Sequence, residues 1–99
     1  MVKHIVLIKI KASSGIEKKK RILLLKESLE KLPSLIHEIK YYDIGVNIST
    51  RPDAYNLAVI SEFTDVNELN IYREHPEHQK VVKLLAEIKE DVAVVDYET

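Results

Sequence analysis

Two imidazoles and a phenol lie within seven residues of one another, in the segment Tyr72-Arg73-Glu74-His75-Pro76-Glu77-His78. Proline lacks an N–H group and has a preset φ, so it is best tolerated in the first turn of a helix. We therefore expect a helix to begin at Pro76, with His78 in its first turn and Tyr72 at the end of the preceding segment. Histidine exchanges a proton near neutral pH, and a tyrosine beside it can stabilise a developing oxyanion. The segment predicts a catalytic acid–base pair, Tyr72 and His78, that faces one cavity. The structural alternative is that Tyr72 packs in the core and the histidines only decorate the start of a helix.

The composition is typical of one ordinary globular domain over residues 1–99, with 45% hydrophobic and 31% charged residues. Fifteen basic and sixteen acidic residues give a net charge of −1, so no overall field favours nucleic acid or an acidic membrane. The chain has no cysteine, which excludes disulfides, zinc-thiolate sites, iron–sulfur clusters and thiol nucleophiles. Residues 2–11 do not read as a signal peptide, and no segment has the roughly 20 apolar residues that span a bilayer. We expect a cytoplasmic protein that binds neither nucleic acid nor membrane.

The hydrophobic spacing predicts an α+β fold with the order β-α-β-β-α-β. Strands are expected at residues 2–11, 38–48, 55–63 and 92–98. A capping box at Ser14 and Glu17 predicts a first helix that Pro33 ends, a second capping signal at Asp65 predicts a short helix to about Tyr72, and a longer helix runs from Pro76 to about residue 89. The order is that of a ferredoxin-like domain, in which helices cover one face of a four-stranded antiparallel sheet.

Several expected strands are apolar on both faces, although two helices can cover only one face of the sheet. A bare second face would expose a contiguous apolar patch, which marks an interaction site. The simplest cover is a second copy of the same sheet about a two-fold axis. We therefore expect a homodimer through the open sheet face that forms a dimeric α/β barrel. The opposed apolar residues are Ile5 and Leu7 against Val6 and Ile8, and Ala93 and Val95 against Val92 and Val94.

A mostly apolar cavity with a few polar groups is expected between the helices and the inner face of the sheet, and such a cavity suits a small organic ligand. The ligand-pocket residues predicted beside the catalytic pair are His4, Val6, Ile8, His75, Val82, Val92 and Val94. His75 and His78 also have the spacing of a chelating pair, but Pro76 between them sets a non-helical approach and no carboxylate partner is evident. We expect no metal and no cofactor.

Three segments together resemble the stress-responsive A/B barrel (Dabb) family over essentially the whole chain. They are Lys3-His4-Ile5-Val6-Leu7, Tyr72 with His75-Pro76-Glu77-His78, and Val95-Asp96-Tyr97. The resemblance implies a dimeric α+β barrel. In a plant polyketide cyclase branch of the family, the tyrosine and the second histidine of this motif work as an acid–base pair, which implies that role for Tyr72 and His78 and a pocket position for His4.

The chain departs from the cyclases where they carry aromatic residues and a further histidine. Ile22, Leu23, Val81 and Leu57 stand in those regions, so the pocket is expected to be less polar and aromatic polyketide specificity is not expected to transfer. Two functions stay open. One is binding of a small apolar or carbonyl-containing molecule; the other is a cyclase, isomerase or decarboxylase that uses Tyr72 and His78. Cofactor-free monooxygenase chemistry ranks below both because it is suggested only by the shared scaffold.

Overall fold

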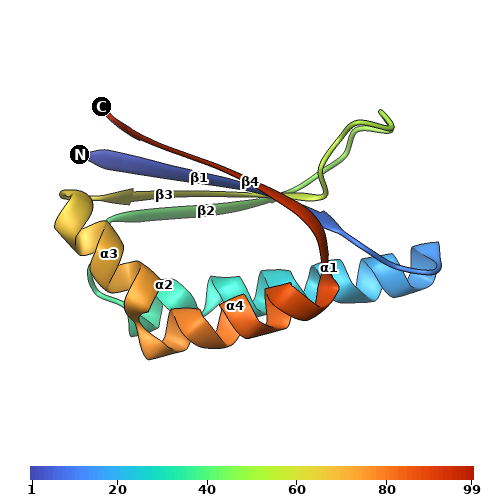
Figure 1. The fold of residues 1–99 in the computed structure, drawn as a ribbon, viewed down its shortest axis with the longest axis horizontal. Coiled ribbons are helices and arrows are strands. Elements are labelled where there is room, and N and C mark those ends of the chain that lie inside the picture. The colour runs from blue at the N-terminus through green and yellow to red at the C-terminus, as the bar shows by residue number, and fades with distance from the viewer.

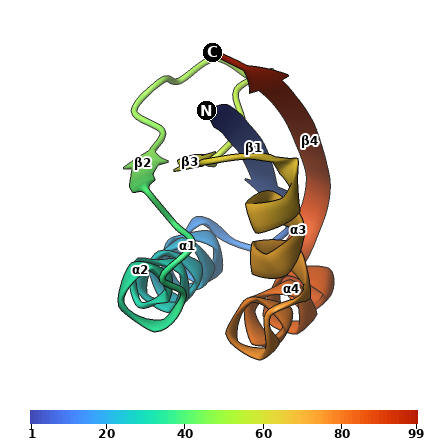
Figure 2. The same ribbon diagram turned by 90° about the vertical axis from the view of Figure 1, so that its left-hand side faces the viewer.

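Helices lie on one face of a curved antiparallel sheet in the computed structural model, which describes residues 1–99 (Figures 1 and 2). The elements in chain order are β1 (Val2–Ile10), α1 (Gly15–Glu30), α2 (Leu32–Leu35), β2 (Tyr41–Val46), β3 (Leu57–Phe63), α3 (Val66–Glu74), α4 (Pro76–Ile88) and β4 (Lys89–Glu98). The strand order across the sheet is β2-β3-β1-β4, with all pairs antiparallel. The predicted ferredoxin-like α+β fold is confirmed.

The helix starts follow the local chemistry of their caps. The Ser14 hydroxyl accepts a hydrogen bond from the Glu17 N–H at 3.1 Å, and the Asp65 carboxylate accepts one from the Glu68 N–H at 2.9 Å. Pro76 opens α4 as predicted. The expectation that Pro33 ends the first helix was wrong in detail, because α1 already ends at Glu30 and Pro33 lies in the first turn of α2. A first helical turn tolerates proline, since the N–H groups there have no helical partner.

The register of the sheet decides which side chains share a face. His4 lies opposite Ser61 of β3 and Asp96 of β4, and directly opposed residues of antiparallel strands point to the same side. This side faces the helices and forms the core. The buried core residues are Val2, Ile8, Ile10, Leu25, Leu29, Leu32, Ile36, Leu57, Val59, Phe63, Leu69, Tyr72, Val81 and Ile88.

The other face of the sheet has no cover within the protomer (Figure 2). Leu7 at its centre is 37% exposed, and Val95 and Tyr97 of β4 are exposed by 52% and 44%. The loop between β2 and β3 rises on this same side, away from the helices (Figure 1). No helix has the length and apolar character that a membrane crossing needs. The apolar open face predicted from the alternation of residues is therefore present.

Candidate active site between the sheet and the helices

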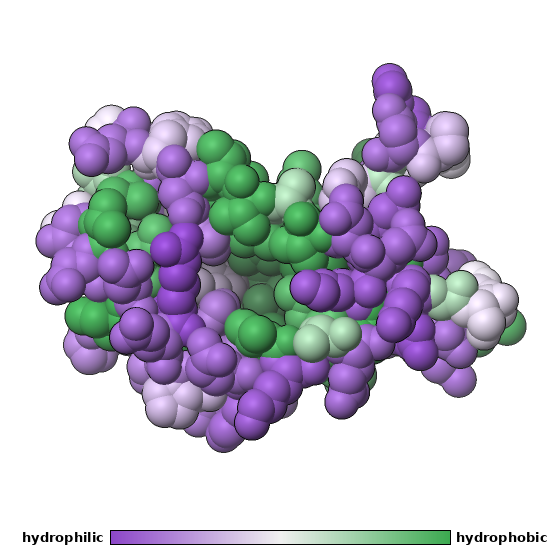
Figure 3. Space-filling model, viewed as in Figure 1, coloured by the Kyte–Doolittle hydropathy of each residue, from purple (hydrophilic) through white to green (hydrophobic).

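A small cavity of about 50 Å³ lies between the inner face of the sheet and the helices. Most of its wall is aliphatic, and its polar groups are two imidazoles and one phenol. Figure 3 shows a hollow bordered by hydrophobic residues on the side of the molecule where β4 and α4 lie. The residues that line the cavity are His4, Val6, Ile8, Leu25, Leu29, Val59, Tyr72, His78, Val81, Val82 and Leu85.

His78 enters the cavity from the first turn of α4, where Pro76 places it. Its Nδ1 lies 3.1 Å from the carbonyl oxygen of Arg73. Because a carbonyl can only accept, Nδ1 carries the hydrogen, and in the neutral ring Nε2 bears the lone pair. Burial lowers the pKa of His78, and the hydrogen bond to Arg73 opposes this only in part, so the neutral ring predominates at neutral pH. His78 therefore presents a basic nitrogen.

Tyr72 comes from the end of α3, and only 2% of its surface is exposed. Its ring packs at 4.3 Å between centroids against His78 and at 5.0 Å against Phe63. Its hydroxyl lies 2.9 Å from the hydroxyl of Tyr42 on β2. Burial raises the pKa of Tyr72 to about 12, although the hydrogen bond from Tyr42 works in the opposite direction. Burial also raises the pKa of Tyr42. Both phenols are therefore protonated, and when Tyr42 donates to Tyr72, the Tyr72 hydrogen is available to a ligand oxygen.

His4 comes from β1 and is buried, with 6% of its surface exposed. Its Nδ1 is hydrogen-bonded to the Asp96 carboxylate, which is directly opposite in the register of β1 and β4. The second oxygen of Asp96 accepts from the Arg73 guanidinium at 2.5 Å. Burial alone would raise the pKa of Asp96, but the hydrogen bond from His4 and the charge of Arg73 hold it below its usual range. His4, Asp96 and Arg73 thus form one connected group.

Neither Asp96 nor Arg73 was among the residues predicted for the site. The sequence did hold a signal for Asp96, because it continues the inner-face alternation Val92, Val94, Asp96 and is a charged residue at the end of an apolar strand. Its partner depends on the strand register, which is a tertiary property. The hydrogen bond between Tyr42 and Tyr72 was not predicted from the sequence either.

The structure brings six of the nine predicted site residues to the cavity: His4, Val6, Ile8, Tyr72, His78 and Val82. The other three do not line it. His75 is the N-cap of α4, and its Nδ1 accepts from the Glu77 N–H at 3.1 Å. Val92 and Val94 lie on the inner face of β4, but β4 is an edge strand and Val94 remains 55% exposed. Val92 and Val94 do meet the β1 face as predicted, opposite Ile8 and Val6, but they do not line the cavity.

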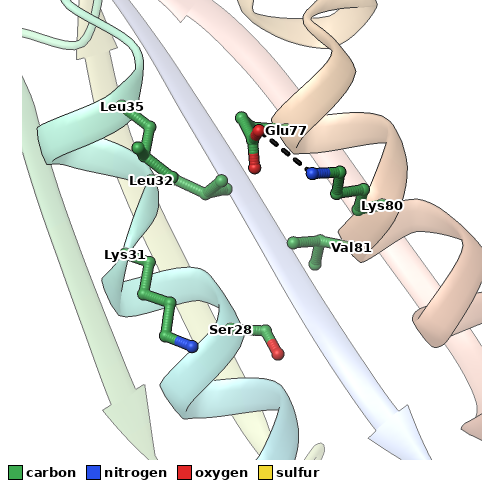
Figure 4. Close-up of a pocket in the computed structure, with 7 residues that line it drawn as sticks. All are labelled: Ser28, Lys31, Leu32, Leu35, Glu77, Lys80 and Val81. Carbon is green, nitrogen blue, oxygen red and sulfur yellow. Dashed lines mark hydrogen bonds and ion pairs between the residues drawn. The ribbon is translucent and has the colours of Figure 1, made fainter.

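A larger surface groove of about 210 Å³ runs between α1–α2 and α4 (Figure 4). Its polar groups are Ser28, Lys31 and the ion pair between Glu77 and Lys80, which are three residues apart on the surface of α4. Surface pairs of this kind are typical of solvated helices. No three His, Cys, Asp or Glu side chains are grouped so that they could hold a metal ion. The buried cavity is the place where titratable groups converge.

The chain matches the family described as Stress Responsive A/B Barrel Domain (Dabb) over residues 2–99. The protein belongs to the Dabb family. An uncharacterized Streptomyces coelicolor protein is 36% identical to this Dabb protein over 98 residues, with 99% of both chains covered.

Solved structures of similar proteins share the ferredoxin-like fold of this Dabb protein. A dimeric protein of unknown function with that fold from Bacteroides fragilis is 39% identical and superimposes with a TM-score of 0.89. The match covers 99% of this chain and 95% of that chain. A hydroxynitrile lyase from Passiflora edulis superimposes with a TM-score of 0.82 at 22% identity, over 97% of this chain and 90% of that chain. At that identity the likeness concerns the fold alone. Dimeric association is thus described for relatives of this fold.

Proposed function

We propose that this Dabb protein binds a small apolar or carbonyl-containing molecule in the cavity of each protomer of a homodimer. The observation that carries the proposal is the convergence of Tyr72, His78 and His4 on one otherwise aliphatic cavity. The Tyr72 hydroxyl would donate a hydrogen bond to a carbonyl oxygen, while the aliphatic wall would cover the apolar part of the ligand. Small-molecule sites usually consist of an apolar pocket with a few polar groups at defined positions.

The size of the cavity limits the ligand. One enclosed water needs roughly 10–15 Å³, so about 50 Å³ corresponds to a handful of non-hydrogen atoms. Drug-sized ligands occupy pockets of about 300–1,000 Å³. We therefore expect short aliphatic aldehydes and ketones to fit, and we expect larger aromatic molecules to require movement of Val82 or Leu85 on the half-exposed side of α4.

Homodimerisation through the open sheet face is part of the same proposal. Leu7, Val95 and Tyr97 leave a partly exposed apolar surface there, and exposed apolar patches of this kind mark association sites. A stable interface typically buries about 800 Å² per partner. The loop of residues 47–56 rises beside this face and would border a second sheet packed upon it (Figure 1). The cytoplasmic location stays a prediction.

Thermal-shift titration with short aldehydes and ketones tests the binding proposal. A ligand at 100 times its dissociation constant stabilises a protein by about 2.7 kcal/mol, which is a readily measured shift. The stabilisation should be lost in Tyr72→Phe. It should be kept in His37→Ala, because the His37 side chain is 93% exposed and does not line the cavity. Absence of stabilisation by every compound, or equal stabilisation of wild type and Tyr72→Phe, would contradict the proposal.

A second candidate function is proton transfer at a carbon next to a carbonyl group. It is favoured by the Arg73 carbonyl, which holds His78 in the tautomer with a basic Nε2. His78 would remove the proton, the C–H electron pair would form a C=C bond while the π pair of the carbonyl moves to its oxygen, and Tyr72 would stabilise the resulting enolate by a hydrogen bond. Such general acid–base groups contribute about 10²- to 10⁴-fold in rate.

Hydrogen–deuterium exchange at the ligand separates the two functions. A bound ketone incubated in D₂O should lose its α-hydrogen signals in the NMR spectrum at a rate that falls about 10²-fold or more in His78→Ala. A ligand that stabilises both proteins and exchanges at the uncatalysed rate with each would assign the cavity to binding alone.

A further inference from the structure

We infer that Arg73 and Asp96 are positioning residues that orient His4, and that His4 is a third ligand-facing polar group of the cavity, with Nε2 as a hydrogen-bond acceptor. This deepens the proposed function, because it presumes that the cavity is the ligand site. Its test needs no ligand, so the two can fail separately.

The chain of contacts runs from the surface to the cavity. The Arg73 guanidinium, 42% exposed, donates to one oxygen of Asp96, and the other oxygen accepts from Nδ1 of His4. A carboxylate can only accept, so the hydrogen on Nδ1 of His4 is assigned by its partner. In the neutral ring, the lone pair then lies on Nε2, on the side of the ring away from Asp96.

The free nitrogen of His4 is reachable from the cavity. Nδ1 is the only ring nitrogen of His4 that makes a hydrogen bond in the protein, and no side-chain nitrogen or oxygen without a partner is fully buried. His4 lines the cavity, where its ring lies 6.2 Å from that of Tyr72 between centroids. Nε2 of His4 is therefore placed to accept a hydrogen bond from a ligand.

Arg73 is attached to both imidazoles of the site. Its carbonyl oxygen accepts from Nδ1 of His78, and its side chain holds the carboxylate that accepts from Nδ1 of His4. Hydrogen bonds at the far nitrogen commonly set the orientation and tautomer of a functional histidine. One residue, next in sequence to Tyr72, is thus connected to both histidines: directly to His78 through its carbonyl oxygen, and to His4 through Asp96.

This arrangement defines the ligand chemistry more closely. The cavity offers one hydrogen-bond donor, the Tyr72 hydroxyl, and two acceptors, Nε2 of His4 and Nε2 of His78. A small carbonyl compound that also carries a hydroxyl group matches this set, because its carbonyl accepts from Tyr72 and its hydroxyl donates to one imidazole. A simple ketone has no hydrogen to donate and would leave both imidazole acceptors without a partner, whereas the hydroxyl compound leaves only one, so the ketone should bind more weakly when these groups are desolvated.

The replacement Asp96→Asn makes a specific prediction for His4. The Arg73 guanidinium can only donate, so the side-chain oxygen of the asparagine would turn toward it. The amide NH₂ would then face His4 and donate a hydrogen bond to Nδ1. The hydrogen of His4 would then move to Nε2, and the acceptor in the cavity would become a donor. Exchange of a carboxylate for an amide beside a histidine is known to impose the wrong tautomer in this way.

Long-range proton–nitrogen NMR correlation of labelled protein at alkaline pH reports the tautomer directly. In wild type, His4 is expected with the hydrogen on Nδ1; a hydrogen on Nε2 would overturn the inference without any variant. In Asp96→Asn, the hydrogen is expected on Nε2, and retention on Nδ1 would equally overturn it. Asp91→Asn removes a carboxylate from the same strand, bonded to Tyr55 instead, and should leave His4 unchanged.

The double variant Arg73→Ala with Asp96→Asn tests the part played by Arg73. Without the guanidinium, the asparagine amide is free to turn its oxygen toward His4, so a substantial population with hydrogen on Nδ1 should return. A merely structural role for Arg73 would not restore a tautomer. If the double variant shows the same inverted tautomer as Asp96→Asn alone, Arg73 does not orient Asp96.

Discussion

The hydrogen bond between the hydroxyls of Tyr42 and Tyr72 is predicted to stabilise the fold as a pair, so that removing one hydroxyl costs more than removing both. The oxygens are 2.9 Å apart, and Tyr72 is only 2% exposed. Replacing either residue by phenylalanine leaves the other hydroxyl without this partner inside the protein. A buried polar group that loses its partner costs about 1–3 kcal/mol, whereas replacing both partners by apolar groups of the same shape is nearly neutral.

The expected shifts are large enough to measure. For a domain of this size, 1 kcal/mol corresponds to a change of about 4–8 °C in the melting temperature. Tyr42→Phe and Tyr72→Phe should each lower it by several degrees, and the double variant should lie closer to wild type than either single variant. Tyr41→Phe is the matched control, because Tyr41 is adjacent on β2 but 49% exposed on the opposite face; it should change stability by less than about 0.5 kcal/mol.

Chemical denaturation of wild type, the two single variants and the double variant gives the coupling energy. All four are measured at one protein concentration, because the proposed dimerisation would add to apparent stability. We expect a coupling of about 1 kcal/mol or more between the two replacements. If the effects of Tyr42→Phe and Tyr72→Phe add within about 0.3–0.5 kcal/mol in the double variant, the hydroxyls are independently solvated and the reasoning fails.

Three further predictions concern acid stability, the open face and the cavity wall. The pKa of His78 is lower in the folded than in the unfolded protein, so its contribution to stability is present above about pH 6.5 and is lost as the pH falls through the folded-state value. Urea denaturation should therefore show that His78→Gln loses less stability at acid pH than wild type. An equal loss of stability in both proteins would contradict the burial argument. Leu7→Asp should convert the dimer to monomer in analytical ultracentrifugation, while Ile16→Asp, at a 72% exposed position of α1, should stay dimeric; a dimeric Leu7→Asp would move the interface elsewhere. Leu25→Ala, at a fully buried position of the cavity wall, should cost about 2–5 kcal/mol and admit larger ketones in the thermal-shift assay, and an unchanged ligand range would show that Leu25 does not limit the cavity.

The element order was predictable from short-range patterns because each element carries its own local signal. Ser14 with Glu17 and Asp65 with Glu68 are N-terminal caps, and the structure shows both bonds. Pro76 marks the start of α4 for the same kind of reason, since its backbone suits only a first turn there. The predicted end of the first helix at Pro33 was wrong because the sequence does not distinguish a proline that follows one helix from a proline in the first turn of the next.

The presence of apolar residues on both faces of the strands was also predictable from the sequence, because side chains alternate between the two faces of a strand with a period of two. That pattern separates the face of His4, Val6 and Ile8 from the face of Ile5 and Leu7 before any fold is known. It does not say which strand is at an edge. Val92 and Val94 have the right period for the cavity, but β4 is the last strand of the sheet, where Val94 stays 55% exposed and neither residue reaches the cavity wall.

The amino-acid sequence by itself determined the family, the fold and the presence of Tyr72 and His78 at a helix junction, because these depend on local caps, alternation and one short motif. Only the tertiary structure decided which groups work together. The pairing of His4 with Asp96 follows from a strand register that joins the two ends of the chain. The pairing of Tyr42 with Tyr72 follows from the packing of α3 against β1 and β3, beside β2. Contacts between residues 92 or 30 positions apart depend on how strands align and helices pack, and no short-range pattern encodes that alignment.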